Sequence, residues 1–273
     1  MSTRPIAGSL AACLLSLSAL GCAVNVSEAR SARVLRGGEI QVSEVNNVVV
    51  PTRAVSHFVS NVQPSIDAAK NGSVTDEERD KLVGAATAIA LTGPGFGVHT
   101  DIGVGLGYRY DLQARLGNGI YALSLRRGFD LGTWQAAIGT RAAYNSGAAF
   151  LEYLDDVAEI IEVSDMKRFD GQLFAQVGKE WGEWGKLWFG AKGIWSPLKV
   201  QVDARKVNGG VDTVHTTLWQ GGGFVGGALG YRWIHFVAEL TVLGASGKAT
   251  VFGRDYDLSG VVVAPSWGLM GTF

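Results

Sequence analysis

The feature that most constrains this chain is the alternation of its last thirteen residues, 261–273. Read as an extended strand, this segment has one apolar face, formed by Val261, Val263, Trp267, Leu269 and Phe273. The other face carries mostly small residues, with Met270 as its one large side chain. Because strand side chains point alternately to two faces, the pattern predicts a strand with one apolar side. A strand that ends the chain on an aromatic is what a closed barrel needs, since its last strand pairs with its first.

The same alternation runs through the chain from Val98 onward, between turns rich in Gly, Asn and Asp. Including the last strand, it predicts nine strands. Single-chain transmembrane barrels usually have an even number of strands. We therefore predict a first strand in Gly38–Val50, which contains Ile40, Val42 and the run Val48–Val50. The total is ten, and eight is the alternative if one weak segment belongs to a rim or loop.

A soluble antiparallel sandwich would also alternate, so the barrel prediction depends on how charge and aromatics are distributed. The polar face carries both signs of charge and many glycines, which suits a crowded lumen. Aromatic residues cluster near strand ends, as in the interfacial girdles of membrane barrels. They are Tyr108, Tyr110, Phe129, Trp181, Trp184, Tyr231, Trp233 and Phe273. Mean hydropathy is +0.16, yet no internal run of about 18 apolar residues follows the N-terminus, which argues against a helical membrane protein.

These features together resemble the small outer-membrane β-barrels of Gram-negative bacteria, whose C-terminal assembly signal ends in Phe, as Phe273 does here. The resemblance implies an all-β, antiparallel transmembrane barrel over residues 38–273, located in the outer membrane. It also implies contact with outer-membrane lipids and folding by the barrel-assembly machinery. The short connections near 109–110, 129–133, 182–185 and 232–233 are then periplasmic, and the long ones, 145–167 and 244–259, face outward.

The N-terminus predicts export. Arg4 precedes the apolar run Ile6–Leu20, so residues 1–21 resemble a signal peptide. Cys22 follows Ala19-Leu20-Gly21, which resembles a lipobox and implies lipidation of Cys22, with residues 22–37 as a lipid-anchored linker. Ala19 and Leu20 depart from the preferred residues, and ordinary cleavage near Gly21 or Ala23 is the alternative.

Residues 52–92 break the β pattern and predict a short helical insertion into the barrel. Apolar residues at helical spacing end at Pro64, and Thr75–Glu78 forms a capping box for a second helix. Between the two helices the sequence resembles a degenerate EF-hand calcium loop. Its predicted metal ligands are Asp67, Asn71, Ser73, Thr75 and Glu78. Ala69 replaces one usual ligand, and an Asn-Gly turn before a capped helix explains the same residues without Ca²⁺.

Two histidine–carboxylate pairs, His99 with Asp101 and His235 with Glu239, share the polar register and are candidates for general-base chemistry. No nucleophile motif accompanies them, so a salt-bridged lumen is the favoured interpretation. The same interpretation covers Arg115, Arg126, Arg141, Arg168, Asp170, Lys186 and Lys192. The glycines of Gly221–Gly226 match a dinucleotide-binding pattern, but they lie on a predicted strand and are interpreted as space for large neighbours such as Trp.

The sequence therefore predicts a non-enzymatic outer-membrane barrel (lipo)protein with a structural or binding role at the cell envelope. A formal net charge of −1 argues against a nucleic-acid partner. The alternatives are a narrow transport channel and a lipid-modifying enzyme. No catalytic residue and no cofactor is predicted, apart from Ca²⁺ at the loop.

Overall fold

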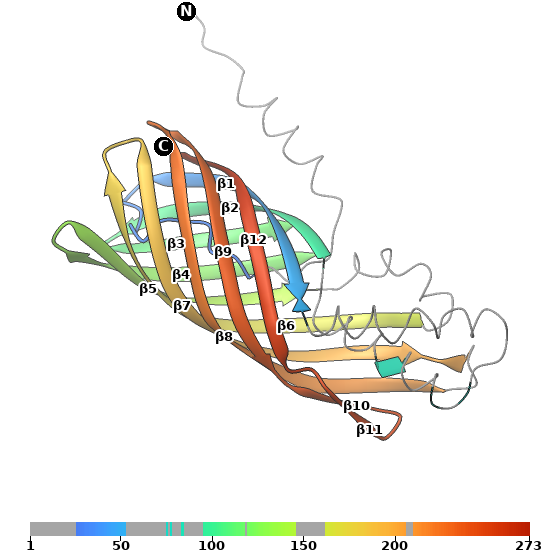
Figure 1. Cartoon of the computed structure of the whole chain (residues 1–273). Helices are drawn as coiled ribbons and strands as arrows, with labels where there is room; N and C mark the ends of the chain where they lie inside the picture. The colour runs from blue at the N-terminus through green and yellow to red at the C-terminus, as the bar shows by residue number, and fades with distance from the viewer. Residues whose placement is uncertain are drawn as a thin grey trace, which may run out of the picture.

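The computed structural model describes residues 26–52, 75, 77, 83–84, 95–117, 119–145, 162–205 and 210–273. Ten of its strands form one antiparallel barrel (Figure 1). They are β1 (Ile40–Pro51), β2 (Gly95–Gly107), β3 (Tyr110–Gly117), β4 (Ile120–Leu131), β5 (Trp134–Asn145), β6 (Glu162–Trp181), β7 (Gly185–Asp203), β8 (Val211–Tyr231), β9 (Ile234–Ser246) and β12 (Gly260–Thr272). Two further strands, β10 (Lys248–Val251) and β11 (Arg254–Asp257), form a separate hairpin.

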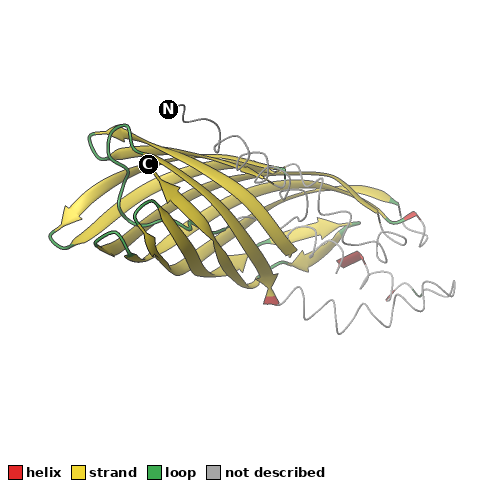
Figure 2. Ribbon diagram, turned by 90° about the horizontal axis from the view of Figure 1, so that it is seen from above, coloured by secondary structure: helices red, strands yellow, loops and turns green. Residues whose placement is uncertain are grey.

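The barrel is closed because β1 pairs with β2 on one side and with β12 on the other. Its strands run obliquely around the lumen (Figure 2). Closure removes the unpaired edges that an open sheet would expose, which is the condition for crossing a bilayer with strands. The structure confirms the predicted all-β antiparallel barrel of ten strands, including a first strand that begins at Ile40.

The two ends of the barrel differ in their connections. Four short turns, between β2 and β3, β4 and β5, β6 and β7, and β8 and β9, lie at the end where β1 begins and β12 finishes; we call it the short-turn end. The opposite end is the long-loop end. There β6, β7 and β8, with 20, 19 and 21 residues, extend the wall beyond the neighbouring strands (Figure 1).

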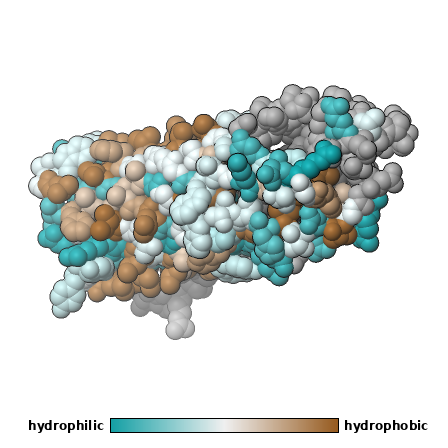
Figure 3. Space-filling model, turned by 90° about the horizontal axis from the view of Figure 1, so that it is seen from below, coloured by the Kyte–Doolittle hydropathy of each residue, from teal (hydrophilic) through white to brown (hydrophobic). Residues whose placement is uncertain are grey.

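The outward side of the wall is apolar. Large side chains such as Ile102, Leu173, Phe236 and Leu269 are exposed there, and Figure 3 shows the apolar patches along one face. The eight aromatic residues predicted to form a girdle all lie in or beside the short turns, or at the C-terminus. Outward apolar residues and a ring of aromatics at one end are what a lipid-embedded barrel presents.

The predicted helical insertion, 52–92, lies mostly outside the described residues. Of its residues, Thr52, Glu77, Val83 and Gly84 have helical geometry. A Cβ added to Gly84 would overlap the ring of Tyr256 on β11, so this position contacts the hairpin at the long-loop end. Among the described residues, no helix is long and apolar enough to span a membrane.

Candidate functional site

The most distinctive site is inside the barrel. Residues 26–35, which we call the plug, form a coil in the lumen before the chain turns at Gly37–Gly38 into β1 (blue coil in Figure 1). Val26, Glu28 and Arg30 are at most 2 % exposed. Because a coil has no strand partner, its buried backbone groups need hydrogen bonds from side chains.

Glu239 on β9 binds the plug through its backbone. Its Oε1 accepts a hydrogen bond from the N–H of Glu28 at 2.7 Å, and its Oε2 accepts one from the N–H of Ala29 at 2.8 Å. Ala29 has a φ of 46°, the left-handed conformation that helps successive N–H groups converge on one anion. Trp188 donates from Nε1 to the same Oε2 at 3.0 Å, so the carboxylate is held in place from the wall.

Arginines on the opposite wall bind the plug carbonyls. Arg115 and Arg141 donate from Nη1 to the carbonyl oxygen of Ser27 at 2.8 and 3.3 Å. Arg126 donates from Nη1 to the carbonyl oxygen of Ser31 at 2.8 Å. Guanidinium groups carry several fixed donors, so each can bind a carbonyl and a carboxylate at once.

The side chain of Glu28 enters a cluster of cations. Arg141 Nη2 donates to its Oε2 at 2.8 Å, and Gln172 donates to Oε1. Arg30 and Lys192 lie 3.8 and 3.9 Å from its carboxylate oxygens. A fully buried carboxylate requires this degree of compensation, because an unpaired buried charge is strongly destabilising.

The side of the plug away from the arginines is apolar. Ala29 and Ala32 pack in one buried cluster with wall residues from five strands. These are Val45, Trp188, Phe224, Ala228, Val237 and Met270. The plug therefore contacts polar side chains of β3–β6 on one side. On the other it packs against apolar side chains of β7–β9, β12 and β1, among which Glu239 and Lys192 bind its backbone.

Glycines in the wall make room for this segment. A Cβ on Gly105 would overlap the carbonyl oxygen of Arg36, and a Cβ on Gly128 would lie 2.9 Å from Val34 Cγ2. Gly226, one of the glycines of the strand β8 pattern, instead faces the indole of Trp188, which a Cβ would overlap. The predicted role of that pattern, space for a Trp side chain, agrees with this packing.

A second ion network closes the short-turn end. Arg33 donates from both Nη atoms to Glu39 at 2.8 and 2.9 Å, and its Nε lies 3.0 Å from Glu180. Ser31 donates to the same Glu180 at 2.9 Å. A cavity of about 420 Å³ remains beside this network, between the chain at 32–37 and the turns near 108 and 129.

The predicted lumen charges all face inward. Asp101 and Arg115 form a bidentate pair at 2.6 and 2.7 Å, and Arg126 binds Asp111 in the same way at 2.9 and 2.6 Å. Arg168 lies 2.6 Å from Asp170, and Lys186 lies 3.7 Å from Glu180. The interpretation of the polar face as a salt-bridged lumen fits these contacts.

The two histidine–carboxylate pairs make different contacts in the structure. His99 Nε2 lies 3.6 Å from Asp101, whose carboxylate already binds Arg115. The Nε2 atom of His235 lies 3.0 Å from the backbone oxygen of Glu183, while Glu239 binds the plug. Neither carboxylate is thus placed primarily to orient a histidine base.

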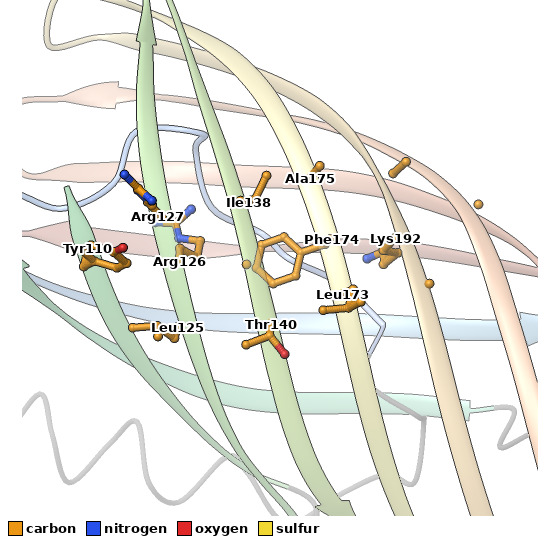
Figure 4. Close-up of a pocket in the computed structure, with 14 residues that line it drawn as sticks. Tyr110, Leu125, Arg126, Arg127, Ile138, Thr140, Leu173, Phe174, Ala175 and Lys192 are labelled. Carbon is orange, nitrogen blue, oxygen red and sulfur yellow. The ribbon is translucent and has the colours of Figure 1, made fainter.

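The outer wall carries a groove of about 750 Å³ over β4–β7 (Figure 4). Leu125, Ile138 and Leu173 flank small residues that include Ala175 and Gly193. At the short-turn side Arg127 lines the groove. Its guanidinium carbon lies 5.6 Å from the ring centre of Tyr110 and 5.4 Å from that of Phe129, within cation–π range.

Phe273 lies at the closing seam. Its N–H donates to the carbonyl oxygen of Ile40 at 2.8 Å, and its own oxygen accepts from the N–H of Ile40 at 2.9 Å. The Phe273 ring is exposed. The last strand therefore closes on the first, as the pattern predicts, and the role of Phe273 as an assembly signal stays a prediction.

The lipidation and calcium predictions fall almost entirely outside the described residues. Cys22 does, and so do four of the five predicted ligands, Asp67, Asn71, Ser73 and Glu78. Thr75 is described and exposed. Within the described ranges no three His, Cys, Asp or Glu residues are grouped so that they could hold a metal ion.

Sequence reasoning missed the plug and assigned residues 22–37 to a linker. Residues 26–35 of this segment lie in the lumen. A signal was present: charged residues at 28, 30 and 33 alternate with small ones at 27, 29, 31 and 32, beside a predicted lumen rich in charge. The alternation stops at Ala32–Arg33 and has no apolar face, so nothing local indicated where its charges would find partners.

No protein-family model matches this chain, and no curated protein sequence matches it. Among solved structures, Neisserial surface protein A is similar at 10% identity and a TM-score of 0.29, over 86% of this chain and 96% of that chain. Ail, the attachment invasion locus protein of Yersinia pestis, gives 10% identity and 0.26 over 87% and 99%. The toluene transporter TbuX of Ralstonia pickettii gives 9% and 0.30 over 94% and 96%. These TM-scores are too low to carry an argument from the functions of those proteins.

Proposed function

We propose that this protein is a non-enzymatic β-barrel of the bacterial outer membrane whose lumen is closed by its own N-terminal segment. In this proposal the short-turn end faces the periplasm, and the long-loop end presents the extended strands β6–β8 to a ligand or partner outside. The observation that carries the proposal is the plug, which is bound by polar side chains on one wall and packed against apolar side chains on the other.

Closure by the plug favours a scaffold over an open channel. Its polar contacts link Glu28 to β5, β6 and β9, so movement of the plug would break hydrogen bonds on several strands together. Exposing those buried charges without partners would be unfavourable. Ten strands also leave a narrow lumen once side chains fill it.

Outer-membrane lipids are the partner that the outer wall fits. The groove in Figure 4 is apolar along most of its length, which suits an acyl chain, and Arg127 at its short-turn side offers a guanidinium to a lipid phosphate. The exposed aromatics of the short-turn end suit the membrane interface.

The rival function, a narrow transport channel, is tested by single-channel recording of the refolded protein in a planar bilayer. The full chain is expected to give no stable conductance. Deletion of residues 26–35 is expected to open the lumen and to give a stable ion conductance, because this segment fills the space between the walls. Deletion of residues 248–257, ten residues of the β10–β11 hairpin, is the matched control and leaves the pore closed.

Steady conductance of the full chain, equal to that of the plug deletion, would contradict the proposal and favour the channel. An enzymatic role has weaker support, because His99 lies within the ion network of Asp101 and Arg115. Release of fatty acid from outer-membrane lipid by the purified barrel would favour the enzyme.

A further inference from the structure

Polar side chains interrupt the apolar outer face where the barrel closes. Glu44 and Asn46 are the fifth and seventh of the twelve residues of β1, and Thr100 on β2 lies opposite Glu44. Val45 and Asn47, which alternate with them, are buried toward the lumen. This register turns Glu44 and Asn46 outward in the middle of the strand. We call Glu44, Asn46 and Thr100 the β1 patch.

The surroundings of the β1 patch are apolar. Ile102 on β2 and Trp267 and Leu269 on β12 are exposed beside it, and Leu269 is the strand partner of Glu44. Among the barrel residues whose burial the structure describes, Glu44 is an acidic residue turned outward within a strand rather than beside a turn. An ionisable group that faces hydrocarbon is unfavourable, and such a group usually marks a functional position.

The β1 patch also contains unused hydrogen-bonding capacity. Within the part of the chain that the structure describes, Glu44 Oε2 has no hydrogen-bond partner; it is covered by this chain's own atoms, so a second copy would reach it after the carboxylate rotates outward. Asn46 donates one long hydrogen bond, 3.5 Å, to the carbonyl oxygen of Trp267. A carboxamide carries two N–H donors, so the pattern at the patch combines an unsatisfied acceptor with a weakly used donor group.

We propose that the β1 patch is the surface through which two copies of this protein associate side by side in the membrane. Glu44 of one copy accepts a hydrogen bond from Asn46 of the partner subunit, and the reverse contact forms with it. All copies of a membrane protein have the same orientation, so their two-fold axis lies along the membrane normal and juxtaposes residues of similar depth. Glu44 and Asn46 are two residues apart on one strand face, so the tilt of the strand leaves about 5 Å between them in depth, which the two side chains together can span. Hydrogen bonds between polar groups are a recognised source of association within bilayers.

The test uses the full chain in phospholipid vesicles, with association measured by energy transfer between differently labelled copies at several protein-to-lipid ratios. Glu44→Leu is expected to weaken association about tenfold, since both reciprocal contacts disappear. The same change is expected to raise the denaturant midpoint of the barrel, because Leu suits a lipid-facing position better than Glu. A purely structural role for Glu44 would lower that midpoint. Thr140→Leu, an outward polar-to-apolar change on β5, is the matched control and leaves association unchanged.

A mixing experiment makes the pairing itself testable. Glu44→Leu copies and Asn46→Leu copies each lose both contacts with their own kind, whereas a mixed pair keeps one Glu44–Asn46 contact. Mixed pairs are therefore expected to associate more strongly than either variant alone. Wild-type protein that stays monomeric at every ratio would overturn the proposal. So would mixed pairs no tighter than the single variants, or a Thr140→Leu effect equal to that of Glu44→Leu.

Discussion

Glu239 and Glu28 are joined inside the barrel across 211 residues of sequence, the carboxylate of the first accepting the backbone N–H of the second at 2.7 Å. The contact connects the next-to-last strand of the barrel with a segment that precedes its first strand. Two carboxylate residues approach one another here because only the backbone of Glu28 faces Glu239, while its side chain turns to Arg141. Glu28 therefore links two parts of the barrel wall, β9 through its backbone and β5 through its side chain.

The first prediction concerns this contact. Glu239→Leu leaves the N–H groups of Glu28 and Ala29 buried without acceptors, at about 1–3 kcal/mol for each unsatisfied group. Hydrogen exchange at these two amides is expected to accelerate by about tenfold or more. Glu239→Gln keeps one acceptor oxygen and is expected to give a smaller effect. Exchange measured by mass spectrometry on the refolded barrel checks both variants.

Asp170→Asn is the control for that measurement, because Asp170 binds Arg168 and Ser196 rather than the plug. It is expected to leave exchange at residues 28 and 29 unchanged. Equal acceleration by Asp170→Asn and Glu239→Leu would mean that any lost lumen charge loosens the plug, and that Glu239 has no special part.

The second prediction tests the fit between plug and wall. Gly105→Ala places a methyl group against the carbonyl oxygens of Arg36 and of Leu35, the last residue of the plug, and both are backbone atoms with little freedom to move. Overpacking of this kind typically lowers the free energy of unfolding by about 1–3 kcal/mol. Gly193→Ala, on the outer wall with open space around its Cβ, is the matched control. The denaturant midpoint of each variant is measured by tryptophan fluorescence. Equal midpoints would contradict the close packing of Gly105 against the chain at Arg36.

The third prediction concerns the C-terminus. Phe273→Lys, or deletion of Phe273, is expected to block assembly in cells, because a charge replaces the aromatic residue next to the seam with Ile40. Phe252→Lys in the β10–β11 turn is the control, as that position lies outside the barrel sheet. Heat-modifiable migration of the membrane fraction reports assembly. Normal migration of the Phe273→Lys protein would mean that assembly does not depend on Phe273.

The fourth prediction concerns lipidation. If Cys22 carries acyl chains, Cys22→Ser abolishes labelling with a radioactive fatty acid. Val26 is buried in the lumen, and four extended residues reach about 14 Å, so acylation at Cys22 would pull on the start of the plug. Hydrogen exchange at residues 26–28 is then expected to be slower in Cys22→Ser than in the labelled wild type. A wild type that takes up no label indicates ordinary signal-peptide cleavage.

The fifth prediction concerns the loop at 67–78. In the EF-hand pattern Glu78 supplies two oxygens, whereas Asp76 is not a ligand. Glu78→Gln is therefore expected to weaken Ca²⁺ binding far more than Asp76→Asn, although both remove one negative charge near the same predicted helix start. Calorimetric titration of the whole barrel in detergent measures this. No heat at millimolar Ca²⁺, or an equal loss of binding in both variants, would contradict a calcium site. The sequence at 67–78 would then be an Asn-Gly turn before a capped helix.

The architecture of the wall could be predicted because it depends on local rules. Strand side chains alternate with a period of two, and turns need Gly, Asn or Asp, so strands such as 134–141 and 234–242 are visible in a single stretch of sequence. The first strand was harder to interpret, since Val48, Val49 and Val50 are apolar on both faces. Only the pairing of Glu44 with Leu269 and Thr100 fixes which side of β1 faces outward.

The sequence by itself indicated nine of the ten strands and the charged character of the lumen, since both follow from alternation within short segments. The first strand, and with it closure of the barrel, followed from the even strand number of membrane barrels, with eight strands as the alternative. Only the tertiary structure shows that residues 26–35 fill the lumen. It also shows that Glu44 and Asn46 face outward where β1 pairs with β12. The contacts of the plug join a coil to side chains as distant as Arg115, 88 residues from Ser27, and Glu239, 211 residues from Glu28, and no periodicity encodes such distances. The position of this coil depends on side chains from several strands, which only the closed barrel brings together.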